Sequence, residues 1–259
     1  MCKLLLFSLF PLALSAQFTM TLSPRTNAAF DNYVKTAEPQ MTWRAKYGQV
    51  KAGEVRVDAA RGDGSIDVIE GMVHDWVGAV VVPGATVEQA LAVLQNYGSY
   101  KSVYAPEVTD SRLLSRNGDQ WRVHLRIVKK KVLSAVLNTE YEVVYKDLGS
   151  GRWTITSRST RVAEVVDGKE LPVGESNGFL WRLNAYWVIE PRANGVYLEC
   201  RTISLSRDIP FGLGFAVGPF VKSLPIESLR TTMTATARAL GRPVAAREDP
   251  AVAEKKVGE

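Results

Sequence analysis

Residues 174–178 read GESNG, which matches the G-x-S-x-G turn that presents a serine nucleophile in many hydrolases. That turn needs a strand before the serine and a helix after it, so that the hydroxyl stands on a strained bend. Here Pro172 interrupts the preceding stretch, and an alternating apolar segment typical of a strand follows the motif. Both histidines, His74 and His124, precede Ser176, whereas these hydrolases place the histidine after the serine, although other orders exist. The pattern therefore predicts a loop, not a catalytic serine.

Few other residues could carry catalysis or bind a metal. GLGFAVG at 212–218 is only faintly similar to a dinucleotide-binding fingerprint, because no strand with an acidic residue follows it. We expect its glycines to let an apolar segment bend near the mouth of a cavity. Two histidines need carboxylates of unknown position to complete a zinc site, and His124 falls on the polar face of a predicted strand, where we expect a surface residue. Cys200 falls on an apolar face, where a thiol packs as a small hydrophobe. We predict no metal, no cofactor and no catalytic residue.

Charge and the first residues indicate the class of protein. The 259-residue chain has a net charge of +5, and its densest basic run, Lys129–Lys131, is too short for the basic face that nucleic-acid binding requires. Residues 1–16 combine one lysine, an apolar run and small residues, the layout of a secretory signal peptide. We therefore expect a periplasmic or secreted protein, with an uncleaved membrane anchor as the alternative. Cleavage would leave Cys200 as the only thiol and exclude an intramolecular disulfide.

Apolar periodicity outlines the elements that must position any site. Residues 23–37 read as a capped helix, and 42–71 as an irregular or hairpin-bearing region. A long apolar strand at 72–84 precedes a helix at 86–97 that begins with a capping box. Alternating segments between 121 and 206 indicate antiparallel strands with one apolar and one polar face.

The last part of the chain changes character. Pro225 is predicted to begin an amphipathic helix that runs to about Leu240 and is roughly 24 Å long. The tail at 242–259 is polar, lacks periodicity and is predicted to be disordered. The apolar faces of sheet and helix are both buried if the sheet curls around this helix, which predicts an α+β fold.

Three phrases carry a resemblance to a known superfamily: VHDWVGAVVVPGA at 73–85, GFLWRLNAYWVIEP at 178–191, and YLECRTISLSRDIPFGLG at 197–214. Together with the order of elements, they resemble a secreted bacterial branch of the START-like, or Bet v 1-like (SRPBCC), superfamily, whose members mostly lack an assigned activity. The resemblance implies a helix-grip fold over about residues 72–241, with a cavity for lipids, sterols, polyketides or other apolar molecules between sheet and helix. The superfamily also includes aromatases and cyclases.

The predicted organisation is a signal peptide at 1–16, an N-terminal helix and irregular extension at 17–71, the helix-grip domain at 72–241 and a disordered tail at 242–259. Ligand contacts are predicted for apolar side chains on the inward faces and for two polar groups near the rim. These are Trp76, Trp181, Leu183, Trp187, Leu198, Cys200, Leu229 and Met233, with His74 and Tyr104 at the rim.

We expect this protein to bind or transport a hydrophobic small molecule or lipid without catalysis. One alternative is a cyclase- or aromatase-like enzyme, which would need an inward-facing ionisable group. The other is a protein-interaction module with a closed core. The sequence excludes nucleic acid as a partner and leaves open a transient membrane contact, the protein partner, the oligomeric state and the ligand.

Overall fold

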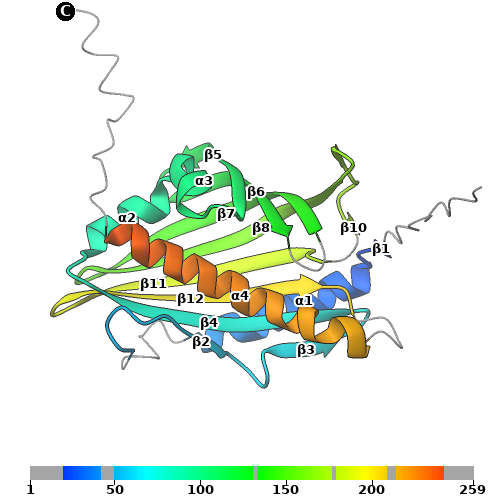
Figure 1. Cartoon of the computed structure of the whole chain (residues 1–259), viewed down its shortest axis with the longest axis horizontal. Coiled ribbons are helices and arrows are strands. Elements are labelled where there is room, and N and C mark those ends of the chain that lie inside the picture. The colour runs from blue at the N-terminus through cyan, green and yellow to red at the C-terminus, as the bar shows by residue number, and fades with distance from the viewer. Residues whose placement is uncertain (1–19, 42–49, 131–133, 177–178, 209–213, 242–259) are drawn as a thin grey trace, which may run out of the picture.

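The computed structural model describes residues 20–41, 50–130, 134–176, 179–208 and 214–241, and in it a curved ten-stranded antiparallel sheet wraps around the C-terminal helix (Figure 1). The main path of the sheet runs β2 (Arg56–Ala59), β4 (Gly71–Pro83), β12 (Gly195–Ser206), β11 (Arg182–Arg192), β8 (Arg152–Val166), β7 (Ser134–Gly149), β6 (Gln120–Lys130) and β5 (Val108–Asn117). β3 (Ser65–Val68) also pairs with β4, and β9 (Lys169–Glu170) pairs with β8. A separate two-stranded sheet joins β1 (Met20–Thr21) to β10 (Glu175–Ser176).

The helices are α1 (Pro24–Ala37), α2 (Val87–Gln95), α3 (Tyr100–Val103) and α4 (Gly214–Leu240), with short 3₁₀ turns at Glu38–Gln40 and Tyr97–Ser99. The predicted caps are confirmed: the Ser23 side chain accepts from the Thr26 amide, and Thr86 with Gln89 forms a capping box at α2. In the part of the chain that the structure describes, no helix is long and apolar enough to cross a membrane.

Helix α4 begins earlier than the sequence predicted. Pro225 lies well inside the helix instead of starting it, because the helix extends upstream to Gly214. The glycines at 214 and 218, which were expected to let the chain bend, therefore lie in a helix, while residues 209–213 lie outside the described part of the chain.

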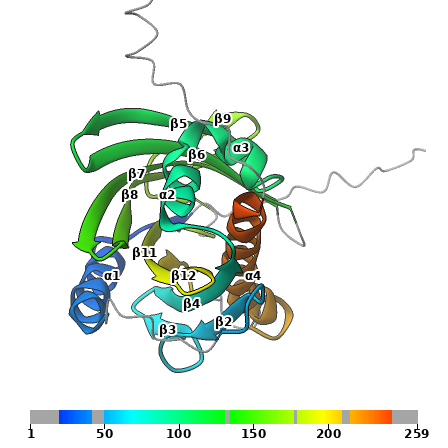
Figure 2. The same cartoon turned by 90° about the vertical axis from the view of Figure 1, so that its left-hand side faces the viewer.

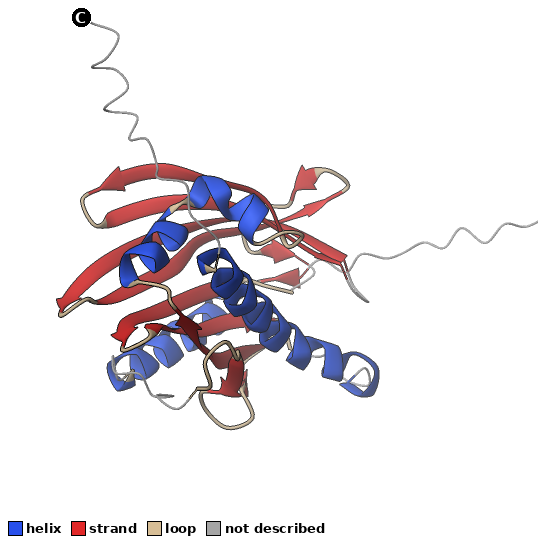
Figure 3. Ribbon diagram, turned by 60° about the vertical axis from the view of Figure 1, so that its left-hand side comes forward, coloured by secondary structure: helices blue, strands red, loops and turns tan. Residues whose placement is uncertain are grey.

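The concave face of the sheet holds the main apolar core and packs on α4, which crosses it as Figure 3 shows. Gly78 permits this packing, because a Cβ atom there would come within 2.8 Å of Met233 and 3.1 Å of Leu229 on the helix. Inward side chains of the middle strands, such as Val123, Tyr141 and Ile155, complete this core.

The convex face of the sheet carries a second apolar core, which α1 covers (Figure 2). Phe30 of α1 is fully buried there against the strands. Beside it, Asp75 of β4 is also fully buried and accepts from the Arg201 guanidinium at 2.7 and 2.5 Å. The hydroxyl of Tyr33 on α1 donates to the same carboxylate at 2.7 Å. The buried ion pair therefore joins β4 to β12, and the Tyr33 hydrogen bond connects α1 to this pair.

The α+β helix-grip fold class is confirmed by this arrangement. Within the predicted extension at 17–71, β2 and β3 are antiparallel partners of β4 in the main sheet. The predicted signal peptide at 1–16 and the predicted disordered tail at 242–259 lie outside the described residues, and the domain boundaries remain predictions.

We predict that Asp75→Ala lowers the free energy of unfolding by about 3–5 kcal/mol, because it leaves the Arg201 charge half-buried without its partner. Chemical denaturation followed by tryptophan fluorescence measures this change. Asp58→Ala breaks the exposed Arg56–Asp58 pair and serves as the control, with an expected cost of about 0–1 kcal/mol. Equal costs for the two variants would contradict the structural role of the buried pair.

Candidate functional site

A cavity of about 690 Å³ lies between the concave face of the sheet and α4. Its apolar wall comes from the middle strands, from the end of α2 and from α4. Representative side chains are Leu94, Val143, Ile155, Leu183, Trp187 and Leu229. An apolar cleft of this size with a few convergent polar groups is typical of a small-molecule site.

Sheet topology gives the cavity a polar edge. Successive antiparallel strands place the end of β6, the start of β7, the start of β11, the end of β12 and the start of β4 at the same edge of the sheet. The charged lining residues come from this edge and from the loops beside it, and they are Glu107, Lys129, Arg207 and Asp208. Lys129 is ion-paired with Glu107.

The opposite edge carries a cluster of phenols. The hydroxyls of Tyr97 and Tyr145 are 2.6 Å apart, and those of Tyr145 and Tyr100 both donate to the Leu94 carbonyl, at 3.1 and 2.6 Å. Burial raises the pKa of Tyr97 to about 12 and raises the pKa of Tyr145 still further. These phenols are therefore neutral at physiological pH and bond chiefly to one another and to the backbone.

His74 lies on the polar side of the cavity wall and is only 2% exposed. Its Nε2 is 2.9 Å from Ser206 Oγ, which in turn donates to the Arg207 carbonyl at 3.2 Å. Its Nδ1 is buried and has no hydrogen-bond partner among the described residues. Burial, with a smaller effect from the Lys222 charge, lowers the pKa of His74 to about 4.

These contacts assign the tautomer of His74. A neutral ring that donates from Nε2 leaves only a lone pair unsatisfied at Nδ1, whereas the other tautomer would bury an unpaired N–H. The Ser206 proton then points to the Arg207 carbonyl and away from the histidine. The pair therefore lacks the arrangement of a base that activates a serine nucleophile.

Six of the predicted ligand-contacting residues line the cavity: His74, Tyr104, Leu183, Trp187, Cys200 and Leu229. Both polar members are buried rather than placed at an open rim, and the Tyr104 hydroxyl lies 3.0 Å from that of Thr236. Cys200 is buried, as predicted, and burial raises the pKa of its thiol.

The other four predicted residues lie elsewhere. Trp76, Leu198 and Met233 share the concave face but belong to the packed core and do not line the cavity. Trp181 is part of the second core under α1, on the opposite face of the sheet. The prediction for Trp181 is wrong because β11 begins only at Arg182, so the side-chain alternation of the strand does not extend back to it.

The sequence prediction missed the polar lining. Thr202, Ser204 and Ser206 of β12 follow Cys200 at alternate positions and all line the cavity, so the strand period that placed Cys200 could have identified them. Tyr97 was predicted to be the last residue of a helix, but α2 ends at Gln95 and Tyr97 begins a 3₁₀ turn, so the period of the helix does not give the direction of its side chain.

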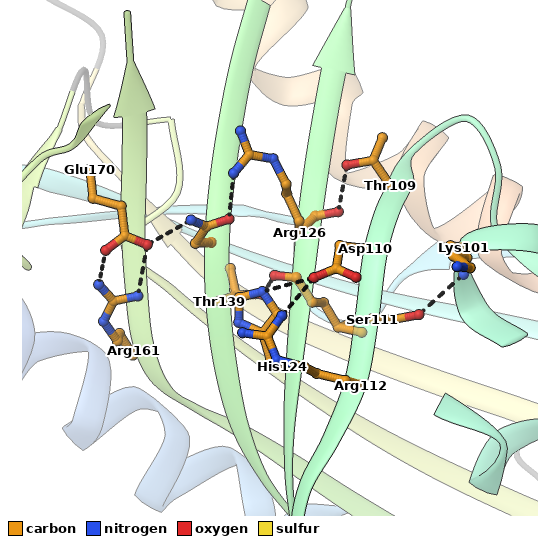
Figure 4. Close-up of polar contacts among 12 residues, drawn as sticks. Lys101, Thr109, Asp110, Ser111, Arg112, His124, Arg126, Thr139, Arg161 and Glu170 are labelled. Carbon is orange, nitrogen blue, oxygen red and sulfur yellow. Dashed lines mark hydrogen bonds and ion pairs between the residues drawn. The ribbon is translucent and has the colours of Figure 1, made fainter. Parts of the chain in front are cut away.

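His124 was predicted to be a surface residue, but it is only 7% exposed on the convex face. Figure 4 shows it beside Asp110 and Arg112, with Arg161 and Glu170 nearby. Its Nε2 is 3.8 Å from Asp110 Oδ2, and Glu170 accepts hydrogen bonds from Arg161 and Asn138. Burial, followed by the Arg112 charge, lowers its pKa. Because adjacent residues of a strand point to opposite faces, this polar network is separated from the cavity by the sheet.

The remaining motifs supply no site among the described residues. Ser176 is buried in the short strand β10, and no described residue between it and β11 is helical, as a nucleophile elbow would require. Within the described ranges, no group of three or more His, Cys, Asp or Glu could hold a metal ion.

We predict a pH dependence of stability that His74 causes. The unfolded chain binds a proton near the ordinary pKa of 6.5, whereas the folded protein binds it only near pH 4. Since the unfolded state then holds more protons, stability is lost as pH falls through this window, by up to about 3 kcal/mol. Urea unfolding across the window should show a flatter profile for His74→Asn than for the wild type.

His124→Asn, at the only other histidine in the chain, is the control for this effect. Because the pKa of His124 is also lowered, but by less than that of His74, His124→Asn should flatten the profile less than His74→Asn does. A profile that His74→Asn leaves unchanged would contradict the assignment.

Comparison with known proteins gives structural neighbours only. No family model matches the chain, and no curated protein matches its sequence. The solved structures similar to it include a STAR-related lipid transfer protein (fragment 25–204) from Xanthomonas axonopodis, 21% identical, with a TM-score of 0.47 over 70% of this chain and 100% of that one. Human STARD10 is 10% identical, with a TM-score of 0.46 over 77% and 79% of the two chains. The Zhui aromatase/cyclase from Streptomyces sp. R1128 is 11% identical, with a TM-score of 0.43 over 65% and 91%. The geometry of the sheet and α4 itself shows the α+β helix-grip arrangement that the sequence predicted, a curved antiparallel sheet around a long C-terminal helix.

Proposed function

We propose that this protein binds and carries a hydrophobic small molecule or lipid in the cavity between the sheet and α4, without transforming it. The observation that carries the proposal is the cavity itself, about 690 Å³ with a largely apolar wall. Burying an apolar ligand there would contribute roughly 0.8 kcal/mol for each methylene group removed from water.

The cavity volume limits the size of the ligand. A volume of about 690 Å³ lies within the roughly 300–1,000 Å³ of pockets that bury a drug-sized ligand. A single acyl chain or a fused-ring molecule is of this size. A diacyl phospholipid is larger and would extend through the polar edge. The same open volume disfavours the alternative of an interaction module with a closed core.

The second candidate is an enzyme that uses acid–base chemistry in the same cavity, and the inward-facing His74 is the observation in its favour. Effective acid–base catalysis needs a pKa near the working pH. The pKa of His74 is lowered to about 4 and that of Tyr97 is raised to about 12, so neither group exchanges protons readily near neutrality. Binding without turnover is therefore the better-supported function.

A periplasmic or secreted location is also part of the proposal and rests on the sequence of residues 1–16 alone. Fractionation of the host cells, with N-terminal sequencing of the recovered protein, tests it. Recovery of the intact N-terminus from the cytoplasm would contradict it.

We predict that Ala185→Phe abolishes ligand binding, because Ala185 lies on the cavity wall and a phenyl ring there would occupy the ligand volume. Native mass spectrometry of protein purified from its own host, followed by organic extraction, should find a bound apolar molecule in the wild type and none in the variant. Circular dichroism and thermal unfolding check that the variant folds.

Val144→Phe is the matched control, because Val144 is 37% exposed and lies in β7 beside the inward-facing Val143. It should retain the molecule. A stoichiometric ligand that survives in Ala185→Phe would place the binding site elsewhere and overturn the proposal.

A further inference from the structure

We propose that the ligand carries an uncharged hydrogen-bonding group, such as a hydroxyl, ketone or ester, which binds to a row of hydroxyls on the sheet side of the cavity. Ser157, Thr202 and Ser204 form this row, and all three line the cavity. The inference rests on the proposed binding function and names the class of ligand that the same cavity selects.

The register of β8, β11 and β12 places these hydroxyls next to one another. Ala185 of β11 pairs with Ser157 of β8 on one side and with Thr202 of β12 on the other. Paired residues present their side chains on the same face, with Cβ atoms about 5 Å apart. Two hydroxyls therefore flank one methyl group, and the small Ala185 leaves space between them. Ser204 is one strand repeat further along β12, toward the polar edge.

These hydroxyls differ from several others in the cavity in having no hydrogen-bond partner among the described residues. Ser206, Ser228 and Tyr104 each make a hydrogen bond within the protein. Ser157, Thr202 and Ser204 make no side-chain hydrogen bond to any other residue in the described ranges, although Ser204 is only 6% exposed. Their oxygens are not among the fully buried unpaired polar atoms, so they are accessible from the cavity and free to bond to a ligand group or to water.

The surroundings of the row favour a neutral group over an anion. Its lining neighbours Val143, Leu183 and Trp187 are apolar, and His74, which pairs with Ser204 across the strands, is held neutral by its low pKa. A buried carboxylate or phosphate without a counter-charge is strongly disfavoured. The charged lining residues are at the polar edge and in its adjoining loops, and there Lys129 already pairs with Glu107.

The experiment compares three probes with the same carbon skeleton: oleyl alcohol, oleic acid and the parent alkene. Tryptophan fluorescence titration of the full-length protein gives their affinities, since Trp187 lines the cavity. We expect the alcohol to bind roughly tenfold more tightly than the alkene, because two hydrogen bonds to hydroxyls of the cavity wall contribute about that factor. The acid at neutral pH should bind more weakly than the alcohol.

Thr202→Val combined with Ser204→Ala removes two hydroxyls of the row. The double variant should lower the affinity for the alcohol about tenfold and leave the affinity for the alkene unchanged. Thr160→Val is the control, because the Thr160 hydroxyl is exposed and donates to the Glu140 carbonyl. It should change neither affinity. Thermal unfolding of each variant confirms that it folds.

Each other outcome overturns the inference in a distinguishable way. Equal affinities for all three probes, unaffected by the double variant, would mean that water satisfies the hydroxyls, and the binding function would stand. If the acid binds most tightly, the ligand's polar group is charged and binds at the polar edge instead of at the row of hydroxyls. If none of the probes binds and Ala185→Phe also retains its molecule, the proposed function itself is wrong.

Discussion

The structure depends on the difference in width between the curved sheet and helix α4. The path from β4 to β5 contains seven strands, which at about 4.8 Å per strand make a surface roughly 30 Å wide. A helix with its side chains is only about 10–12 Å across. Helix α4 packs chiefly on β4, where Gly78 lets Leu229 and Met233 approach the backbone. Part of the concave face must therefore be covered by other elements or left open, and the cavity occupies the open part.

The same sheet is covered on its other face by α1, so several strands are buried on both sides. In β12, Leu198 and Cys200 face the main core, whereas Ile203 and Leu205 face the core under α1. Anchored by the buried Asp75–Arg201 pair, this second layer holds the strands from behind. A sheet supported on its convex face can keep a cavity on its concave face without collapsing into it.

Sequence reasoning recovered the fold because each element carries its own local signal, such as the capping box at Thr86 or the alternation that placed Trp187 and Cys200 on the inward face. It could not separate cavity from core, because alternation gives the face of a side chain and not its distance from α4. Met233 and Leu229 show this on a single helix: only Leu229 borders the open volume.

Other errors have different physical causes. Trp181 was misplaced because the period of a strand holds only within the strand, and β11 starts one residue later. The start of α4 was misplaced because Pro225, a frequent first residue of helices, here lies inside one. Partners that come together only in the tertiary fold, such as Tyr97 and Tyr145 at 2.6 Å, leave no pattern in a single chain.

Electrostatics then decides what a cavity of this shape can do. Burial moves the pKa of the buried ionisable groups of its wall toward the neutral form: it lowers the pKa of His74 and raises the pKa of Tyr97 and of Cys200. The charged side chains remain at the polar edge and in the loops beside it, where solvent and ion pairing stabilise them. A wall of neutral groups with hydroxyls among them suits the uncharged ligand proposed above, because such a ligand needs no desolvated counter-ion. The burial that moves these pKa values toward the neutral form is therefore the same burial that supports the proposed binding of an apolar molecule.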